Sequence, residues 1–331
     1  MTDPIRRLSP VVRLAPAKLN LTLSVVGRRD DGYHSLHSVF VPLALADRLS
    51  LAPLGGGRDT LHVSGFDAGP PADNLVLRAL ATTRIAVGGG WSGGPGPTPA
   101  VAARLEKRIP AAAGLAGGSS DAAATIDGVL EVWGATLEAH VRLAVAVQLG
   151  SDVPFFLAGG PALVEGRGES VAPLRGLHGQ PGVVLVTPGL PVSTPDVFAA
   201  FDAIRTHGDG AVRMSSAHLA EEFRAGLTTA NLVARAGVLA SANDLLPATS
   251  LVVPALVPFK RALSRLLGRP IGLSGSGPTL WALYASEHEA RAAAEVVGAA
   301  LRDGVLTAPG SSEPFVCATS IVSHSQQGSE P

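Results

Sequence analysis

Apolar and polar residues alternate along residues 11–26, which is the pattern of a β-strand with one buried face. A period of two places Lys18 and Asn20 on the same polar face, roughly 7 Å apart along the strand. A polar turn follows and ends in the pair Tyr33-His34. Further apolar runs predict strands over residues 39–45, 48–52, 101–109 and 161–165.

Helical periodicity predicts three helices in the same half of the chain, and typical helix-end residues bound them. Asp73 or Asn74 can cap the first helix, while Gly134 and Gly150 end the second and the third. These helices are expected over residues 73–87, 119–133 and 137–149. Residues 88–99 are rich in glycine and proline, so we expect a surface loop there.

The second half of the chain mixes strands and helices without regular βαβ alternation, which favours an α+β fold. The predicted strands cover residues 182–187, 271–273, 279–284 and 315–322, and the predicted helices cover residues 195–205, 216–225, 229–240, 254–267 and 286–301. A length of 331 residues suits two domains, which we expect over residues 1–175 and 176–322. A polar, disordered tail is expected over residues 323–331.

The composition excludes several classes of function. A formal net charge of −1, without blocks of like charge, argues against a nucleic-acid partner and a polybasic membrane patch. The single cysteine, Cys317, excludes an internal disulfide framework and a cysteine-based zinc site. No stretch approaches about 18 uninterrupted apolar residues, and the N-terminus has no apolar signal core, so we expect a cytoplasmic protein without a membrane partner.

Lysine is rare: Lys18, Lys107 and Lys260 are the three lysines among 26 basic residues. A lysine ammonium is a compact charge and an arginine guanidinium is a planar fork, so the two are not equivalent at a tight site. Each lysine is therefore a candidate for a position that needs an ammonium group. Chance remains the alternative, above all for Lys260 on its amphipathic helix.

Small residues run from Ala111 to Ser120 with only Leu115 interrupting, and an alanine-rich helix follows directly. Such a loop lets a ligand approach the backbone, and the helix start offers unpaired N–H groups and the positive end of its dipole. The pattern predicts a phosphate-binding loop, with a glycine-rich turn capped by Ser119 or Ser120 as the alternative. The loop has neither the Gly-Lys pair of a Walker A motif nor the glycine spacing of a Rossmann fingerprint.

Phosphoryl transfer needs alignment, charge neutralisation and a group that accepts the proton of the acceptor hydroxyl. Asp152 is a candidate for that group, and capping of the turn that follows it is the alternative. Lys18 could lower the pKa of the hydroxyl or stabilise the phosphoryl group. We interpret Asp121 as a structural acid stabilised by the helix dipole.

Tyr33 and His34 form an unusual pair in a chain with only 4% aromatic residues and two tyrosines. A tyrosine beside a histidine suits stacking on a flat ring and hydrogen bonding to its edge, although a tyrosine packed on the domain surface is an equal alternative. The other histidines lack the spacing of metal ligands, so we expect no metal site made by the protein alone.

Three small-residue clusters, at residues 15–20, 110–120 and 272–278, stand in an order that resembles the GHMP kinase superfamily. That superfamily carries an N-terminal strand motif, a central Pro-x-x-x-Gly-Leu-x-x-Ser-Ser loop around the ATP phosphates and a C-terminal glycine-rich motif. The resemblance implies a two-domain GHMP kinase fold. Its parts would be an N-terminal ribosomal-protein-S5-like domain and a C-terminal ferredoxin-like α/β-sandwich domain.

Additional runs at residues 29–34, 149–155 and 242–248 narrow the resemblance to the branch that acts on a cytidine diphosphate-linked methylerythritol. The resemblance spans about residues 13–320. It implies ATP-dependent phosphorylation of the substrate 2-hydroxyl in the non-mevalonate isoprenoid precursor pathway, with Mg²⁺ bridging the ATP phosphates. The implied partners are ATP and the cytidylyl substrate, and we expect a monomer or a weak homodimer.

The resemblance also implies roles for individual residues. Asp152 would be the general base on the 2-hydroxyl and Lys18 its charged neighbour. The substrate-binding residues would be Asn20, Tyr33, His34, Thr194 and Phe198, with Tyr33 and Phe198 around the cytosine ring and His34 at its polar edge. The ATP-binding residues would be Pro110, Ala111, Ala112, Ala113, Gly114, Leu115, Ala116, Gly117, Gly118, Ser119 and Ser120.

Two alternatives stay open, and the loop departs from its relatives. Another superfamily kinase, such as homoserine kinase, would give an aromatic pair nothing to stack on. A non-catalytic, nucleotide-binding regulator on the same fold predicts a missing acid or lysine, and this chain has both.

The loop carries Ala111, Ala112, Ala113 and Ala116 where relatives often carry glycine. Because alanine tolerates positive φ poorly, either those glycines are dispensable or the loop path differs.

Overall fold

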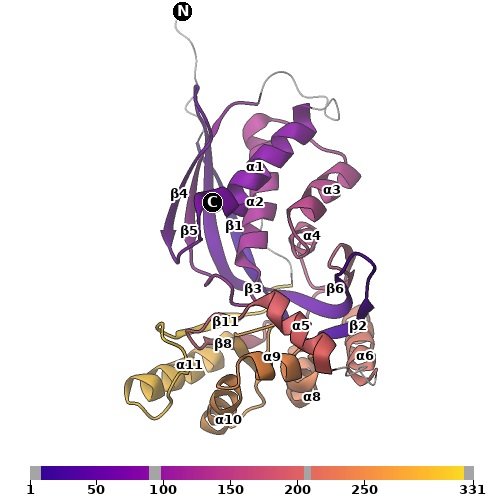
Figure 1. Ribbon diagram of the computed structural model, residues 1–331, viewed down its shortest axis with the longest axis vertical. Coiled ribbons are helices and arrows are strands. Elements are labelled where there is room, and N and C mark those ends of the chain that lie inside the picture. The colour runs from indigo at the N-terminus through magenta and orange to yellow at the C-terminus, as the bar shows by residue number, and fades with distance from the viewer. Residues whose placement is uncertain (1–8, 89–97, 205–209, 324–331) are drawn as a thin grey trace, which may run out of the picture.

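The computed structural model describes residues 9–88, 98–204 and 210–323. The chain forms two bodies stacked one above the other, each with its own sheet and helices (Figure 1). This mixture of two sheets with helices confirms the α+β prediction. The predicted loop at residues 88–99 and the tail at residues 323–331 lie outside the described residues, apart from their end positions.

A long strand, β3 (His34–Pro53), organises the N-terminal body. The sheet has the order β4-β5-β3-β6-β7, and β1 and β2 also pair with β3. Its other strands are β1 (Val11–Asn20), β2 (Ser24–Arg28), β4 (Thr60–Gly65), β5 (Val101–Lys107), β6 (Ala162–Gly166) and β7 (Ser170–Pro173).

The prediction of two separate strands at residues 39–45 and 48–52 is wrong, because β3 runs through both. Ala46 and Asp47 interrupt the apolar pattern but keep their pairing with Pro16 and Ala15 of β1. Asp47 is fully buried, and its carboxylate is satisfied there because it accepts hydrogen bonds from the backbone of the loop after β5. A polar residue with buried partners therefore resembled a turn in the sequence. Strands β4 and β7 were not predicted.

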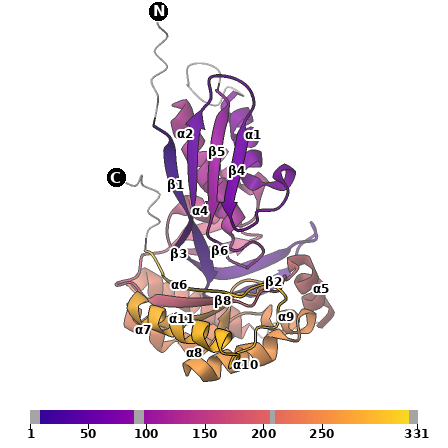
Figure 2. The ribbon, with the colours of Figure 1, turned by 90° about the vertical axis from the view of Figure 1, so that its left-hand side faces the viewer.

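Helices α1 to α4 cover one face of this sheet (Figure 2). They span α1 (Leu75–Ala86), α2 (Gly117–Trp133), α3 (Ala139–Leu149) and α4 (Val153–Ala158). Of the two predicted caps for α1, Asn74 is the one used, because its side chain accepts a 2.9 Å hydrogen bond from the N–H of Val76. Gly134 ends α2 in the left-handed conformation with φ 58°, as predicted.

The C-terminal body has a four-stranded sheet in the order β11-β8-β10-β9. Its strands are β8 (Gly182–Thr187), β9 (Gly272–Leu273), β10 (Leu280–Tyr284) and β11 (Phe315–Ser320). Its helices are α5 (Thr194–Ile204), α6 (Ala211–Ala225), α7 (Thr229–Ala234), α8 (Ala236–Ser241), α9 (Leu246–Val252), α10 (Leu256–Leu267) and α11 (Glu287–Arg302). The helical segment predicted around residues 229–240 consists of two short helices that meet at Arg235, and α9 was not predicted. Within the described residues, no helix combines the length and apolar composition needed to cross a membrane.

Strand β8 is apolar at nearly every position because both of its faces are buried. Val184 and Val186 point to α10 and α11. The alternate residues, Val183 and Leu185, face the N-terminal sheet. The division at residues 175 and 176 falls between β7 and β8, and it stays a prediction since the two bodies share this core.

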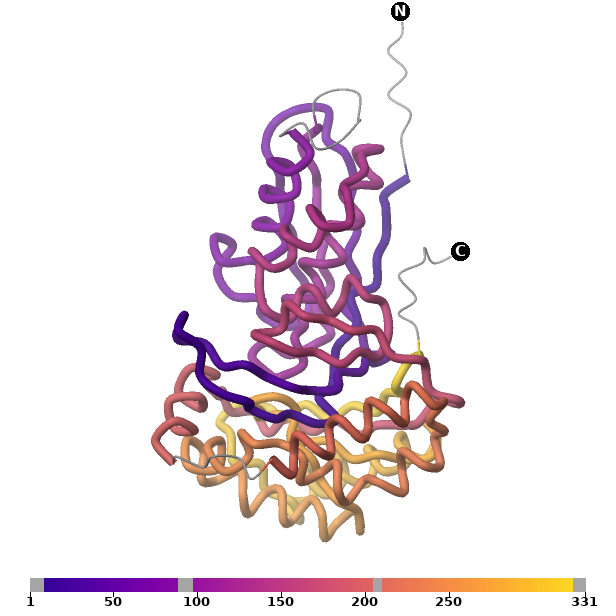
Figure 3. Tube along the Cα trace, turned by 90° about the vertical axis from the view of Figure 1, so that its right-hand side faces the viewer, coloured from indigo at the N-terminus to yellow at the C-terminus, as the bar shows by residue number. Residues whose placement is uncertain are grey.

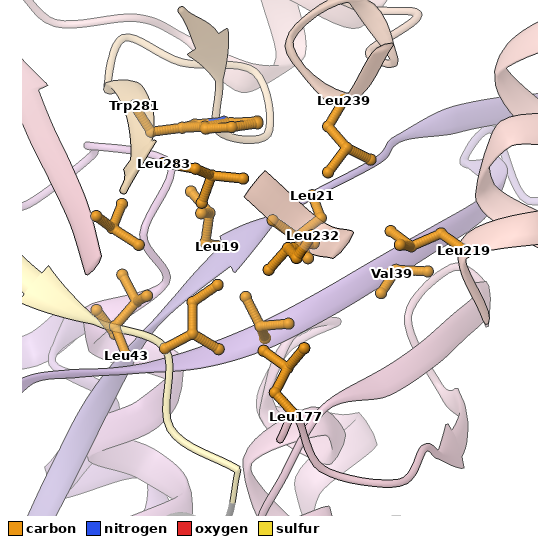
Figure 4. Close-up of a cluster of buried hydrophobic side chains, with 14 of the residues drawn as sticks. Leu19, Leu21, Val39, Leu43, Leu177, Leu219, Leu232, Leu239, Trp281 and Leu283 are labelled. Atoms are coloured by element: carbon orange, nitrogen blue, oxygen red, sulfur yellow. The ribbon is translucent and has the colours of Figure 1, made fainter. Parts of the chain in front are cut away.

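The shared core explains why the bodies are joined rather than merely tethered. Leu19, Leu21, Val39 and Leu43 from β1, β3 and the segment after β1 pack with Trp281 and other residues of the second sheet (Figure 4). The N-terminal strands reach across the top of the C-terminal body in the Cα trace (Figure 3). The residues at the end of β1 are therefore held between the two bodies.

Gly272 provides a test of this packing. A Cβ atom added at Gly272 would lie 2.2 Å from the Trp281 ring, which is only 1% exposed. We expect Gly272→Ala to lower the free energy of unfolding by about 1–3 kcal/mol, the usual effect of overpacking. Gly237→Ala, in α8 with nothing within 4 Å of the added atom, is the control and should be neutral or stabilising. Equal unfolding free energies in denaturant titrations of the two variants would contradict this packing.

Candidate active site

One cavity of about 860 Å³ collects residues from all three small-residue clusters. It is bounded by the loop before α2, the end of β1, the turn before β3, the start of α5 and the turn between β9 and β10. The predicted site residues that line it are Lys18, Asn20, Tyr33, His34, Pro110, Ala111, Ala112, Ala113, Gly114, Ala116, Gly117, Gly118, Ser119, Asp152, Thr194 and Phe198.

Leu115 and Ser120 are the two predicted site residues that do not line the cavity. Leu115 is fully buried in the shared core, and its carbonyl accepts a 3.0 Å hydrogen bond from the backbone N–H of Lys18. The Oγ atom of Ser120 is buried without a hydrogen-bond partner. Leu115 thus anchors the loop, which explains the one bulky residue in a run of small ones.

The three clusters meet at the carbonyl oxygen of Gly114. It accepts a 3.1 Å hydrogen bond from Nζ of Lys18 and a 2.9 Å hydrogen bond from Oγ of Ser274. Gly114 has φ +76°, and a Cβ atom there would lie 2.4 Å from the carbonyl oxygen of Ser274. Only glycine satisfies both the conformation and the close approach.

Two alanines of the loop occupy the left-handed region: Ala112 with φ 51° and Ala116 with φ 55°. The region is strained for residues with a Cβ atom, by about 1–2 kcal/mol each. Ala116 immediately precedes α2, whose first turn supplies unpaired N–H groups to the cavity. The loop therefore keeps a path that favours glycine although the sequence has alanine at these positions.

Lys18 and Asp152 form the charged pair of the cavity, with 3.7 Å between Nζ and Oδ2. The Nζ atom also donates a 2.6 Å hydrogen bond to Oδ1 of Asn20 and lies 4.8 Å from the centre of the Phe40 ring. Burial lowers the pKa of Lys18, and the attraction of Asp152 opposes this shift only in part. The ammonium group is thus held by neighbours on several sides and faces the carboxylate.

Asp152 occupies the N-cap position of α4, but its side chain makes no capping hydrogen bond. Its side chain keeps 32% of its accessible surface in the cavity wall. The structural alternative for Asp152 is therefore not realised, and the carboxylate is available to a ligand.

The other end of the cavity is aromatic. Tyr33 is 53% exposed, and the guanidinium of Arg167 lies 4.7 Å from its ring centre. The His34 ring stacks on Phe198 with 4.8 Å between the ring centres, and its Nε2 atom lies 2.7 Å from Oδ1 of Asp202. The polar edge of this end is thus organised around His34.

Lys107 and Asp121 form a buried ion pair that the sequence did not reveal. Lys107 contacts the carboxylates of Asp47 and Asp121, the latter at 2.7 Å, and all three groups are buried. Burial raises the pKa of Asp121 to about 8, Lys107 opposes the shift and Asp47 adds to it. The dipole interpretation of Asp121 is therefore corrected, because it lies beyond the first turn of α2 and pairs with a buried ammonium.

Three charged residues of the cavity wall were missed from the sequence: Arg28, Arg167 and Asp202. Asp202 lies four residues after Phe198 in α5, so helical spacing could have placed both on one face. Arg167 lies in the turn between β6 and β7, and no local pattern connects it with Tyr33.

Among the described residues, no group of three or more histidine, cysteine or acidic side chains could hold a metal ion.

Comparisons with known proteins identify the family. Residues 74–160 match the family model described as GHMP kinases N terminal domain. A 4-diphosphocytidyl-2-C-methyl-D-erythritol kinase of Paramagnetospirillum magneticum is 39% identical over 292 residues, which cover 86% of this chain and 93% of the relative. The enzyme of the same name from Pelotomaculum thermopropionicum is 38% identical over 283 residues, covering 85% of this chain and 91% of the relative.

Solved structures give the same result. The crystal structure of a 4-(cytidine 5'-diphospho)-2C-methyl-D-erythritol kinase matches with a TM-score of 0.66 and 33% identity, covering 94% of this chain and 99% of that one. A homoserine kinase from Cytophaga hutchinsonii has a TM-score of 0.65 but 16% identity, with 98% of each chain covered, so it shares the fold alone. From the cavity, the loop and these relatives, the chain belongs to the 4-diphosphocytidyl-2-C-methyl-D-erythritol kinase family of GHMP kinases.

Proposed function

We propose that this protein transfers the γ-phosphoryl group of ATP to the 2-hydroxyl of 4-diphosphocytidyl-2-C-methyl-D-erythritol, giving the 2-phosphate and ADP in the non-mevalonate isoprenoid pathway. One observation carries the proposal. A phosphate-type loop, a lysine–carboxylate pair and an aromatic platform line the same cavity. This combination suits a kinase whose acceptor carries a flat base.

Asp152 is the proposed general base. Its carboxylate accepts the proton of the 2-hydroxyl, the oxygen attacks the γ-phosphorus, and the bond to the β-phosphate oxygen breaks to release ADP. Lys18, 3.7 Å from Asp152, stabilises the charge that develops on the hydroxyl oxygen and the phosphoryl group. Asn20 supports this role because its side-chain oxygen holds the ammonium in place at 2.6 Å.

The loop at residues 110–120 and the start of α2 are the proposed cradle for the ATP phosphates. Backbone N–H groups of this segment and the positive end of α2 suit an anion. Asp121 lines the cavity at this end of α2, and its Oδ1 atom is buried without a hydrogen-bond partner. Oxygen atoms are the ligands that Mg²⁺ prefers, so this atom fits an ion that arrives with ATP. When bound, Mg²⁺ would neutralise charge on the phosphates.

The cytidylyl group is proposed to bind at the aromatic end. Tyr33 offers an exposed ring face for stacking, and His34 and Thr194 offer polar groups on the cavity wall. Phe198 completes the proposed sandwich only if the His34 ring moves off it, because the two rings stack in the structure. Tyr33 is therefore the primary platform of the proposal.

Two other functions are less well supported. A homoserine kinase would leave the Tyr33 end of the cavity without a partner for stacking. A non-catalytic regulator would have no use for the close pairing of Lys18 and Asp152. A cytoplasmic location and a monomeric or weakly dimeric state stay predictions.

A substrate panel tests the proposed function. The protein would be incubated with ATP and Mg²⁺ and, separately, with the cytidylyl methylerythritol, homoserine, mevalonate or galactose, and ADP release would be measured. We expect turnover with the cytidylyl substrate alone. Turnover of homoserine in preference to the cytidylyl substrate would overturn the proposal.

Replacement of the proposed base gives the first site prediction. Asp152→Asn should lower kcat by about 10²–10⁴-fold, the usual contribution of general base catalysis, while ATP binding measured by calorimetry stays near that of the wild type. Asp303→Asn, an exposed position after α11, is the matched control and should keep full activity. Near-normal turnover by Asp152→Asn would remove the base assignment.

Loss of the aromatic platform gives the second. Tyr33→Ala should raise the KM for the cytidylyl substrate by about 5- to 100-fold, the range expected for base stacking, and leave the KM for ATP almost unchanged. Tyr33→Phe keeps the ring and should behave like the wild type. If steady-state kinetics showed the two KM values of Tyr33→Ala rising together, stacking of the base on Tyr33 would be excluded.

A further inference from the structure

The proposed substrate has three parts: a cytosine base, a diphosphate and a polyol. The proposed function places the base at Tyr33 and the reacting hydroxyl at Asp152, and any role assigned to a residue between them rests on that proposed function. The diphosphate joins the two ends and carries negative charge, so a cation beside it would strengthen its binding. The cavity wall contains four basic residues, and only those not already neutralised are suitable.

Two of these cations are committed elsewhere. Nζ of Lys107 is enclosed by the carboxylates of Asp47 and Asp121, and its side chain is 4% exposed. Nζ of Lys18 faces Asp152, the proposed site of the chemical step. Lys107 is thus neutralised within the fold, and Lys18 is assigned to the reacting groups rather than to the diphosphate.

The other two cations are arginines. Arg28 is 3.5 Å from the carboxylate of Asp202 and its side chain is 65% exposed. Arg167 is partly buried and, among the described residues, forms no ion pair within 4 Å. Its charge still influences Asp31. Desolvation would raise the pKa of Asp31, but its hydrogen bonds and the nearby guanidinium groups of Arg29 and Arg167 outweigh this and lower it. The positive charge of Arg167 therefore acts on the turn that precedes Tyr33.

The turn that carries Arg167 touches both ends of the cavity. Its guanidinium lies 4.7 Å from the Tyr33 ring centre. The next residue, Gly168, has φ +123°, and a Cβ atom there would lie 2.2 Å from the carbonyl oxygen of Ser151. Ser151 directly precedes Asp152. Arg167 is therefore held in the part of the chain that connects the platform with the proposed base.

The turn is also held in shape by its own hydrogen bonds. The backbone N–H of Arg167 donates a 2.5 Å hydrogen bond to Oε2 of Glu169. The other carboxylate oxygen of Glu169 lies 3.5 Å from Nη1 of Arg29, in the turn before Tyr33. The position of the Arg167 backbone is thus coupled to the turn that presents the aromatic ring.

We infer that Arg167 binds the diphosphate of the cytidylyl substrate. A guanidinium presents paired N–H donors that match two phosphate oxygens, and stacking on Tyr33 limits the freedom that it would lose on binding. The competing explanation is that Arg167 acts only on Tyr33, by fixing the ring. The two explanations differ in one respect: a contact to the diphosphate affects CDP but not cytidine, whereas a role through the ring affects both.

The test measures the affinities of CDP and cytidine by isothermal titration calorimetry for the wild type, Arg167→Gln and Arg167→Lys. Arg167→Gln should weaken CDP binding by about 10- to 100-fold, the range for a lost charge-assisted hydrogen bond, and leave cytidine binding unchanged. Arg167→Lys should restore part of the CDP affinity, because it keeps the charge but not the paired donors. Arg175→Gln, an exposed arginine outside the cavity wall, is the control and should match the wild type.

Three results would overturn the inference. Equal losses for CDP and cytidine would assign Arg167 to the positioning of Tyr33. Unchanged CDP affinity in Arg167→Gln, with the same melting temperature as the wild type, would remove the contact. A wild type that binds CDP no better than cytidine would also exclude it. The proposed function is judged separately by turnover in the substrate panel, so the two ideas can fail independently.

Discussion

The site depends on one carbonyl oxygen, that of Gly114, because it is where three distant parts of the chain are joined. It accepts hydrogen bonds from Lys18 at the end of β1 and from Ser274 in the turn after β9. One donor belongs to the N-terminal body and the other to the C-terminal body, so the phosphate-type loop is fixed only when the two bodies are packed together. The shared apolar core, which includes Leu19 and Trp281, provides that packing. Stability of the interface and geometry of the site are thus parts of the same arrangement.

The charges of the cavity divide into two groups with different duties. The first group is the buried cluster of Lys107, Asp47 and Asp121, which holds the start of the loop in place. Removal of one partner from such a buried group typically costs about 3–5 kcal/mol of stability. Lys18 and Asp152 are also close, but the carboxylate keeps a third of its surface open to the cavity. The two lysine side chains are almost equally buried, at 5% and 4% exposed, so the exposure of the partner carboxylate distinguishes the pair that faces the cavity from the group that holds the fold.

Local patterns predicted what depends on local contacts. The cap at Asn74 and the helix end at Gly134 are determined by neighbours along the chain, and the apolar run of β8 is itself a strand signal. The continuity of β3 through Asp47 was not predictable, because it depends on backbone partners far along the sequence. The candidate site followed the same rule. Spacing and residue type in the sequence indicated Lys18, Asp152 and Tyr33 as candidates. The proximity of Arg167 to Tyr33 arises from the pairing of β6 with β3, which no local sequence pattern indicates.

The left-handed alanines of the loop have a consequence for how a nucleotide is received. A glycine at position 112 or 116 would let the backbone sample many conformations before the ligand arrives. The methyl groups of Ala112 and Ala116 narrow that range but also disfavour the observed φ values of 51° and 55°, so packing around the loop must hold the residues there. Ordering a flexible segment on binding weakens affinity, and a segment ordered in advance avoids that loss. In the proposed binding of ATP, the disorder that a glycine-rich loop would give up on meeting the nucleotide is thus given up earlier, when this protein folds.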